Sequence, residues 1–321
     1  MRDFSGNKAE AGVELTLLDG GMGQELLRRS GDRPTHQWSV RLMRDHPDLL
    51  AQIHAEFFAA GADIATANTY ALQRDRLDGT DLEGAFEALY DIALHAAAQA
   101  RAAHGSGRVA GALGPLHGSY RPEHHPDLDT ARPLYAEGAR RMQGRVDLVI
   151  CETVASLTHA RAALQGAQAA GVPVWLAVTV DDTSGARLRS GEAVADVIAV
   201  ARDEGAAALL VNCSAVEAIP AALDALGPSP LPRGVYANAF TSIATAFKAA
   251  KADVSVLQAR GDLGPARYAD HAQRWHAQGA SIIGGCCETG PAHIAELARR
   301  LRPGTARKPL ANAPRNQTDP V

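Results

Sequence analysis

Cysteines that follow apolar, strand-like runs are the first candidates for chemistry in this chain of 321 residues. Cys213 follows AAALLVN, and the adjacent pair Cys286 and Cys287 follows ASIIGG. Three thiolates can bind one zinc ion and leave a fourth coordination position open, which is typical of a catalytic zinc site. The alternative is that these thiols only pack as small apolar side chains, and for the fourth cysteine, Cys151, we favour that interpretation.

The adjacent cysteines impose a condition on the local backbone. Neighbouring residues of a regular strand point to opposite faces, so Cys286 and Cys287 can bind one ion only where the strand breaks. Gly284 and Gly285 stand directly before them and permit such a break. Four cysteines are too few for a disulfide scaffold, which favours metal binding or catalysis.

Two acidic residues occupy similar places in the sequence. Asp19 stands in LLDGGMGQELLRR, where Gly20 and Gly21 separate it from an amphipathic helical pattern, and Glu152 stands in VICETV. Either carboxylate could bind an ammonium group, and the free N–H groups at the helix start could bind a carboxylate. Alternatively, Asp19 caps the helix and Glu152 interacts with a helix dipole.

The elements that must position these residues alternate between short apolar runs and longer helical patterns. Glycines in AAGAD, AAGVPV, DEGAAA and AQGAS end helical patterns and lead into strands. The intervals between strand starts leave room for a crossover helix each time. The expected strands cover residues 15–18, 63–68, 108–113, 147–151, 174–180, 208–212, 234–238 and 281–284.

Eight such units predict an α/β fold, a closed (β/α)8 TIM barrel in a single domain. An open doubly wound sheet is the alternative, for which a glycine-rich dinucleotide turn would be the usual further sign. In a barrel the C-terminal ends of the strands meet at one face, so the thiols and acids would share one mouth. We expect the barrel to cover residues 14–302, with flexible tails over 1–13 and 303–321.

Composition excludes several classes of function. The formal net charge of -4, without a long block of like charges, argues against nucleic-acid or membrane-surface binding. No apolar run is long enough for a membrane helix, and the first residues are too polar for a signal peptide, so we expect a cytoplasmic protein. Twelve histidines are present, but none has a spacing that indicates a metal ligand. We expect His117, His124 and His125 to be solvated loop residues.

Six segments, in chain order, resemble the homocysteine S-methyltransferase family. They are LLDGGMGQEL, ATANTYAL, GALGPLHGSYRPE, DLVICET, LLVNCS and SIIGGCCETGPAHI, and together they span nearly the whole chain. The resemblance is most specific at Asn212-Cys213 and at Gly284 to Cys287. It implies a TIM barrel and a methyltransferase that makes methionine from homocysteine.

The resemblance also implies a cofactor and substrate contacts. Zn²⁺ would be held by Cys213, Cys286 and Cys287, with the homocysteine thiolate as the remaining ligand. A zinc-bound thiol loses its proton and becomes a nucleophile at neutral pH. The amino-acid end of homocysteine would be held by Asp19, Gly20, Gly21, Thr66 and Glu152. The methyl-donor pocket would include Trp38 and Tyr70, and Asn212, Asn238, Gly284 and Gly285 would support these residues from behind.

The methyl donor is the least determined part of this prediction. CET after the fourth strand resembles the branch that uses S-methylmethionine more than the betaine-using branch, with S-adenosylmethionine a less favoured sulfonium. Ala237 stands where the S-methylmethionine branch typically has proline, and Ala239 and Phe240 stand where that branch usually has a small polar pair. Betaine or another methylated onium compound, a separate corrinoid protein, a different thiol acceptor, or a non-enzymatic zinc- or redox-sensing barrel therefore stay open as alternatives.

Overall fold

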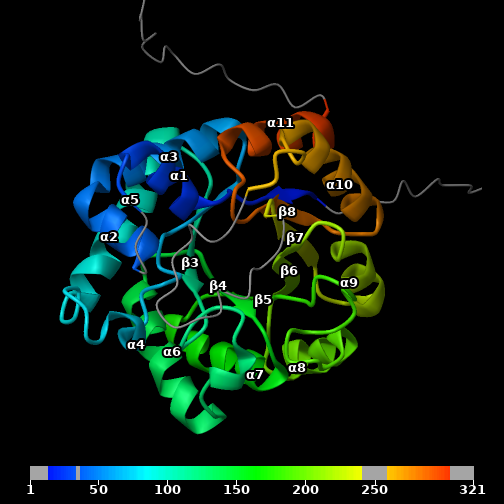
Figure 1. Cartoon of the computed structure of the whole chain (residues 1–321), viewed down its shortest axis with the longest axis horizontal. Helices are drawn as coiled ribbons and strands as arrows, with labels where there is room; N and C mark the ends of the chain where they lie inside the picture. The colour runs from blue at the N-terminus through cyan, green and yellow to red at the C-terminus, as the bar shows by residue number, and fades with distance from the viewer. Residues whose placement is uncertain (1–13, 34–36, 241–258, 304–321) are drawn as a thin grey trace, which may run out of the picture.

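A computed structural model describes residues 14–33, 37–240 and 259–303 (Figure 1). Within these ranges eight parallel strands form one sheet in the order β1-β8-β7-β6-β5-β4-β3-β2. The strands are β1 (Thr16–Leu17), β2 (Ile64–Thr66), β3 (Arg108–Leu113), β4 (Leu148–Val154), β5 (Val174–Val178), β6 (Ala208–Ala215), β7 (Arg233–Asn238) and β8 (Ile282–Gly285). This order confirms the predicted barrel and excludes the open doubly wound sheet.

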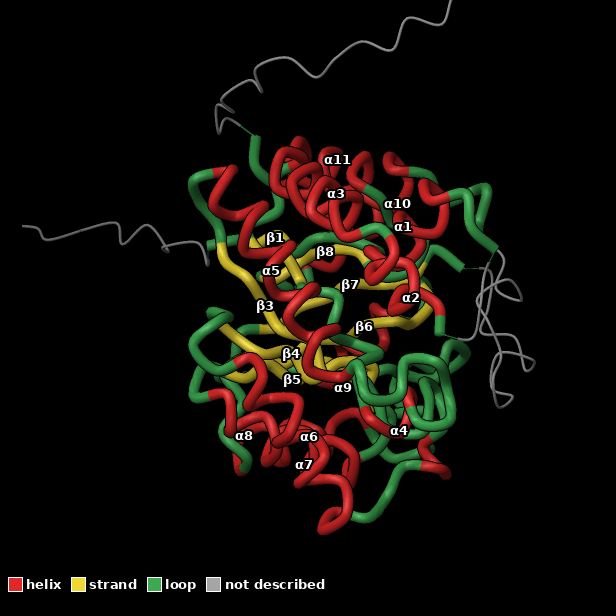
Figure 2. The backbone as a smooth tube through the Cα atoms, turned by 90° about the vertical axis from the view of Figure 1, so that its left-hand side faces the viewer, coloured by secondary structure: helices red, strands yellow, loops and turns green. Residues whose placement is uncertain are grey.

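Helices surround the strands on all sides, as Figure 1 shows along the barrel axis and Figure 2 from the side. The α-helices are α1 (Met22–Ser30), α2 (Trp38–Asp45), α3 (Pro47–Ala60), α4 (Arg74–Leu77), α5 (Phe86–His104), α6 (Leu128–Met142), α7 (Leu157–Ala167), α8 (Val197–Asp203), α9 (Ile219–Leu226), α10 (Pro265–Ala277) and α11 (Pro291–Leu301). Short 3₁₀ turns lie at Pro122–His124, Gln168–Ala170 and Val194–Asp196. Local signals explain several ends: Ser156 caps α7 through its side chain, and α3 ends at Gly61 in the left-handed conformation.

The barrel closes at the seam between β1 and β2. Leu18 and Ile64 form a parallel bridge there, and Asp63 exchanges two hydrogen bonds with Leu17. The Asp63 carboxylate accepts from the Leu17 N–H at 2.7 Å, and the Asp63 N–H donates to the Leu17 carbonyl at 2.8 Å. Arg302, just after α11, forms an ion pair with Asp63 and also donates to the carbonyl of Leu15.

Two apolar layers result from the inward and outward alternation of strand residues. Inside the barrel, residues such as Ile150, Trp175 and Leu210 form a packed core. Outside it, a larger cluster fills the space between strands and helices and includes the completely buried Cys151. The barrel interior is therefore solid, and any cavity for a ligand must lie at its ends.

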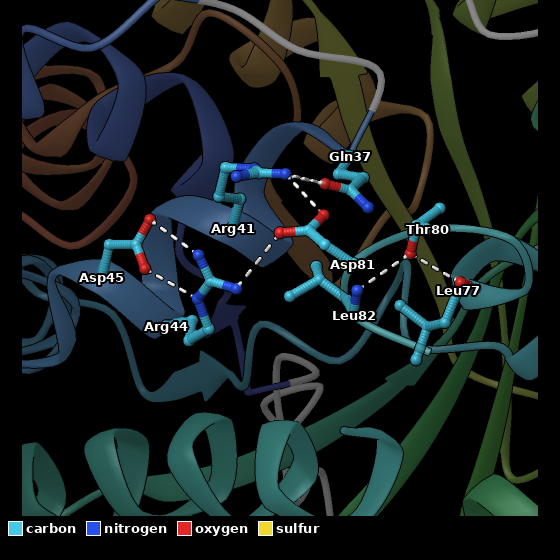
Figure 3. A network of polar contacts seen from close by, with 8 residues as sticks. All are labelled: Gln37, Arg41, Arg44, Asp45, Leu77, Thr80, Asp81 and Leu82. Carbon is cyan, nitrogen blue, oxygen red and sulfur yellow. Dashed lines mark hydrogen bonds and ion pairs between the residues drawn. The ribbon is translucent and has the colours of Figure 1, made fainter. Parts of the chain in front are cut away.

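Helix α2 is an addition between α1 and α3 that lies next to the mouth. Asn68, which follows β2, donates to the backbone carbonyl of Ser39 in α2. On the outer side, Arg41 donates to Gln37 and to Asp81, and Arg44 bonds Asp45 and pairs with Asp81 (Figure 3). These contacts attach α2 to both the loop after β2 and the loop after α4.

Each of the eight predicted strands overlaps one strand of the structure, with one systematic difference at the strand ends. β4 and β6 were expected to end before Glu152 and Cys213, but both strands continue past these residues through an irregularity in register. The tail predicted over 1–13, and that over 303–321 apart from its first residue, lie outside the described residues. No helix among the described residues is both long and apolar enough to cross a membrane.

Candidate active site

A cavity of about 110 Å³ opens at the C-terminal ends of the barrel strands. Most of the residues that the sequence singled out line it, although they come from distant parts of the chain. The cavity wall contains Asp19, Gly20, Gly21, Thr66, Tyr70, Glu152, Cys213, Gly285, Cys286 and Cys287. The topology of the barrel thus brings the predicted thiols and acids to a single site.

The three thiols form the part of the cavity best suited to a metal ion. The Sγ atoms of Cys213, Cys286 and Cys287 all lie within 4.8 Å of one another. Cys213 and Cys286 are in disulfide contact with their Cα atoms 5.9 Å apart, and Cys287 is a free, half-buried thiol. Tetrahedral zinc with bonds of about 2.3 Å holds its sulfur ligands roughly 3.8 Å apart, so the reduced thiols need only a small shift to share one ion.

The vicinal cysteines lie in a turn directly after β8, as the double glycine predicted. The Cys286 N–H donates to the carbonyl of Ala237, and the Cys287 carbonyl accepts from the Ala239 N–H. The Thr289 hydroxyl donates to the Cys286 carbonyl at 2.6 Å. Because backbone groups of β7 hold the turn on one side and Thr289 on the other, both thiols can face the same cavity.

Close backbone approach explains the glycines of both motifs. A Cβ atom at Gly21 would lie 2.6 Å from the carbonyl oxygen of Cys286, which is closer than real contacts allow. The Gly21 N–H donates to the Thr289 carbonyl, so the start of α1 packs directly on the cysteine turn. Added Cβ atoms at Gly20 and Gly285 would both collide with Thr289, and one at Gly284 would collide with Leu18.

Asp19 is almost completely buried beside the cavity, with 4% of its surface exposed. It does not cap α1, whose N-cap is Gly21. Its two carboxylate oxygens instead accept from the N–H of Thr66 at 2.6 Å and from the Thr66 hydroxyl at 2.8 Å. Burial raises the pKa of Asp19 to about 7, although the bonds from Thr66 oppose this rise.

Glu152 is the second acid of the cavity, and it lies inside β4 rather than at a helix start. The Tyr236 hydroxyl donates to its Oε2 atom at 2.9 Å. Burial raises the pKa of Glu152 to about 7, and the nearby charge of Asp19 adds to this rise. The buried Asp19 carboxyl and the half-buried Glu152 carboxyl repel each other, which makes a favourable place for an ammonium group.

Aromatic side chains form another part of the wall. Tyr70 shares a 2.6 Å hydrogen bond between its hydroxyl and that of Ser119. Tyr120, Tyr236 and Phe240 also line the cavity. The two tyrosines were not recognised from the sequence, and Phe240 was noted only as a departure from the S-methylmethionine pattern. Trp38 begins α2, but its side chain lies outside what the structure describes.

Gln24 was also missed by sequence reasoning. It lies in the first turn of α1 and lines the cavity, with 9% of its surface exposed. Its carboxamide bonds no oxygen or nitrogen atom of the described residues and interacts with the Cys287 thiol. A buried amide in a cavity with unused bonding capacity can bond a ligand there. Its position in LLDGGMGQELLRR, one turn after Asp19, was the available signal.

The supporting residues lie behind the cavity wall. Asn212 is completely buried in β6 and bonds Thr153 of β4, whereas Asn238 ends β7 with its Oδ1 atom unpaired among the described residues. The N–H of Ala237 donates to the Tyr268 hydroxyl at 3.1 Å, a bond that proline at this position could not make. Most of the segment after Phe240 lies outside the described residues.

The remaining histidines and Cys151 take no part in the cavity. Among the loop histidines, His117 and His124 are exposed, as expected. His125 is half-buried, because its ring stacks on His159 with centroids 4.2 Å apart and bonds the Tyr135 hydroxyl. Cys151 packs outside the barrel, which agrees with its interpretation as a small apolar residue.

Comparisons with known proteins agree with this site. A family model described as homocysteine S-methyltransferase matches residues 16–301. The chain is 30% identical to a homocysteine S-methyltransferase of Escherichia coli (strain K12), covering 89% of this chain and 95% of that one, and 28% identical to homocysteine S-methyltransferase YbgG of Bacillus subtilis (strain 168), covering 90% and 95%. The crystal structure of the metallated form of homocysteine methyltransferase MmuM from Escherichia coli matches with a TM-score of 0.74 at 28% identity, covering 89% of this chain and 96% of that one.

Proposed function

The chain belongs to the homocysteine S-methyltransferase family, and we propose that it is a zinc-dependent enzyme that methylates the sulfur of homocysteine to give methionine. One observation carries this proposal: three thiols able to share a metal ion lie in the same cavity as two carboxyls with raised pKa values. A zinc store or redox sensor would need the thiols but not the acids. The combination therefore favours an enzyme for a thiol that also carries an amino group.

Cys213, Cys286 and Cys287 would hold the zinc ion, since three thiolates are a donor set that zinc prefers. When bound, zinc supplies a Lewis acid that keeps the homocysteine sulfur deprotonated at neutral pH. Burial raises the pKa of Cys287 to about 12 without a metal. We therefore expect metal binding to release protons and to weaken as the pH falls.

The amino-acid end of homocysteine would bind between β1 and β4. Its ammonium group suits the pair formed by Asp19 and Glu152, and Thr66 orients the Asp19 carboxylate through two hydrogen bonds. Its carboxylate suits the N–H groups in the first turn of α1, beside the carboxamide of Gln24. These contacts would fix the direction in which the sulfur points.

The methyl donor would lie against Tyr70 and its aromatic neighbours, because aromatic faces attract sulfonium and trimethylammonium groups. With S-methylmethionine, the homocysteine sulfur forms a new bond to the methyl carbon while the bond from that carbon to the donor sulfur breaks. The electron pair stays on the donor sulfur, which becomes a neutral thioether, so two methionines result. The sequence CET favours this sulfonium over betaine.

The first experiment combines metal analysis with a panel of donors. The reduced protein is assayed for methionine formation from homocysteine with S-methylmethionine, S-adenosylmethionine and betaine in parallel. We expect one zinc per chain and turnover with S-methylmethionine. Turnover with betaine alone would contradict the sulfonium assignment, and zinc binding without turnover on any donor would contradict the proposed reaction, leaving a corrinoid protein as donor or a different acceptor thiol to be tested.

Cysteine variants test the metal ligands. Cys286→Ser should lose zinc and activity together, because serine is a poor ligand for zinc at neutral pH. Cys151→Ala is the matched control, since this thiol is buried outside the barrel. It should keep both zinc and activity. Full activity of metal-free Cys286→Ser protein would remove zinc from the mechanism.

A further inference from the structure

The two strands that carry Glu152 and Cys213 share an unusual feature. β4 loses its register with β5 between Cys151 and Val154, and β6 loses its register with β7 between Asn212 and Ala215. At these points Thr153 has a φ of 59° and Cys213 a φ of 47°. Residues other than glycine rarely adopt this left-handed conformation, and it persists only where the surroundings hold it. Such bulges redirect side chains next to active sites.

One side chain connects these two irregular points. Asn212, with none of its surface exposed, accepts from the Thr153 N–H at 2.9 Å through Oδ1. Its Nδ2 atom donates to the Thr153 hydroxyl oxygen at 3.2 Å. Because a backbone N–H can only donate, the orientation of the amide is determined. β4 and β6 are not neighbours in the sheet, so this pair of bonds reaches past β5.

The connection joins two different parts of the site. Thr153 directly follows Glu152, which would bind the ammonium group, and Asn212 directly precedes Cys213, which would bind the metal. The bulge of β6 is also attached to the segment directly after β5, because the Thr179 hydroxyl donates to the Cys213 carbonyl at 3.1 Å. The Ser214 hydroxyl also accepts from the Val180 N–H at 2.9 Å. Cys213 is thus anchored to the end of β5, and Asn212 extends this anchoring to Glu152.

We propose that Asn212 is a positioning residue that sets the spacing between the thiolate site at Cys213 and the ammonium site at Glu152. This inference rests on the proposed function, because it takes homocysteine as the molecule whose sulfur and amino group occupy these two sites. A fixed number of bonds separates the sulfur from the nitrogen in that molecule. A rigid connection between the two sites therefore selects the thiol that fits, and loosening it should weaken both sites together.

The test compares two variants of one position with a matched control. Asn212→Leu removes both hydrogen bonds at similar volume, whereas Asn212→Asp keeps an acceptor for the Thr153 N–H. Thr69→Val is the control, since the buried Thr69 hydroxyl bonds the backbone N–H and C=O of Ala112 in a similar clamp between β2 and β3, without contact to Cys213 or Glu152. Zinc affinity is measured by competition with a chelator, and homocysteine binding to the zinc protein by calorimetry without a donor.

We expect Asn212→Leu to weaken zinc binding by about 10- to 100-fold, the usual range for a residue that orients a metal ligand. Homocysteine binding to the zinc-saturated variant should weaken by about tenfold or more, and the absorption of the cobalt(II)-substituted protein should change. Asn212→Asp should weaken zinc binding and homocysteine binding less than Asn212→Leu does. Thr69→Val should lower the melting temperature and leave both affinities within about twofold of the original protein.

Several outcomes would overturn the proposal. If Asn212→Leu changes only one of the two affinities, or neither, the residue does not couple the sites. If Asn212→Leu does not fold, Thr153→Val decides, because it removes only the hydroxyl acceptor; unchanged zinc and homocysteine affinities in this variant would reject the coupling. Failure of the original protein to bind zinc or homocysteine would instead reject the proposed function.

Discussion

Glu152 shows how a single residue can be prepared for a charged ligand. Burial and the nearby charge of Asp19 destabilise its ionised form until a cation arrives, although the hydrogen bond from the Tyr236 hydroxyl partly offsets this effect. Glu152→Gln keeps the shape and the hydrogen bond from Tyr236 but removes the charge. We expect the KM for homocysteine to rise by about 10- to 100-fold, because a charge-assisted bond is worth about 1.5–3 kcal/mol.

Steady-state kinetics at saturating donor, together with metal analysis, check this prediction. Zinc content should stay at the original value, because Glu152 is not a metal ligand in the proposed site. An unchanged KM would remove Glu152 from the binding site for homocysteine. Loss of zinc would show that the substitution disturbs the cysteines instead.

Much of the candidate site was predictable from the residue types at the strand ends. The hydrogen-bond partners of these residues were not predictable. Cys213, Cys286, Asp19 and Glu152 stand out because each follows an apolar, strand-like run, where a barrel builds its active site. Tyr236 could not be recognised in this way, since its role depends on a hydrogen bond to a residue 84 positions away in the chain. It faces the barrel interior between the outward-facing Val235 and Ala237, a pattern that resembles that of any core tyrosine.

At the scale of elements, the barrel was predictable because each strand and helix has its own local pattern. The exact ends of β4 and β6 were not predictable, because Glu152 and Cys213 interrupt the apolar runs that indicate a strand. The strands continue past them only because hydrogen bonds between strands, such as that from the Thr153 N–H to Asn212, stabilise the bulges. Tertiary contacts of this kind leave no signal in a local window of sequence.

The seam between β1 and β2 gives a prediction for barrel closure. Asp63→Ala removes the acceptor of the Leu17 N–H and the ion pair with Arg302. Because the Asp63 side chain is 38% exposed, we expect a modest loss of about 1–2 kcal/mol in the free energy of unfolding. Asp63→Asn keeps an acceptor for the Leu17 N–H, so its free energy of unfolding should fall less than that of Asp63→Ala.

Urea denaturation measures these differences, with Asp91→Ala as the control. Asp91 lies in α5 and forms ion pairs with Arg141 and Arg145 on the surface. Its removal should cost less than about 1 kcal/mol, as is usual for exposed ion pairs. If Asp91→Ala lowers the free energy of unfolding as much as Asp63→Ala does, the seam stabilises the barrel no more than an exposed ion pair does.

For the whole molecule, buried titratable groups should make stability depend on pH in two opposite ways. Burial raises the pKa values of Asp19 and Glu152 to about 7, so the folded chain binds more protons than the unfolded chain between about pH 4 and 7. Their contribution is complete below about pH 4 and is lost as the pH rises through 7. Burial lowers the pKa values of His54, to about 3, and of His159, so these residues destabilise the fold as the pH falls below about 6.5.

The two trends largely cancel between about pH 4.5 and 6.5, so stability of the metal-free, ligand-free protein should be greatest near pH 5 to 6 and should fall as the pH rises through 7. Between pH 8 and 6.5 the two carboxyls together should add about 1–2 kcal/mol to the free energy of unfolding, which thermal melts in a series of buffers can resolve. The double variant Asp19→Asn, Glu152→Gln should lose this slope; a slope that persists would assign it to other groups. Homocysteine binding should show the reverse trend and strengthen from pH 6.5 to 8, because its ammonium group requires both carboxylates ionised. The acids that destabilise the empty site at alkaline pH would then be the ones that bind the substrate, a conflict between stability and function that is common at active sites.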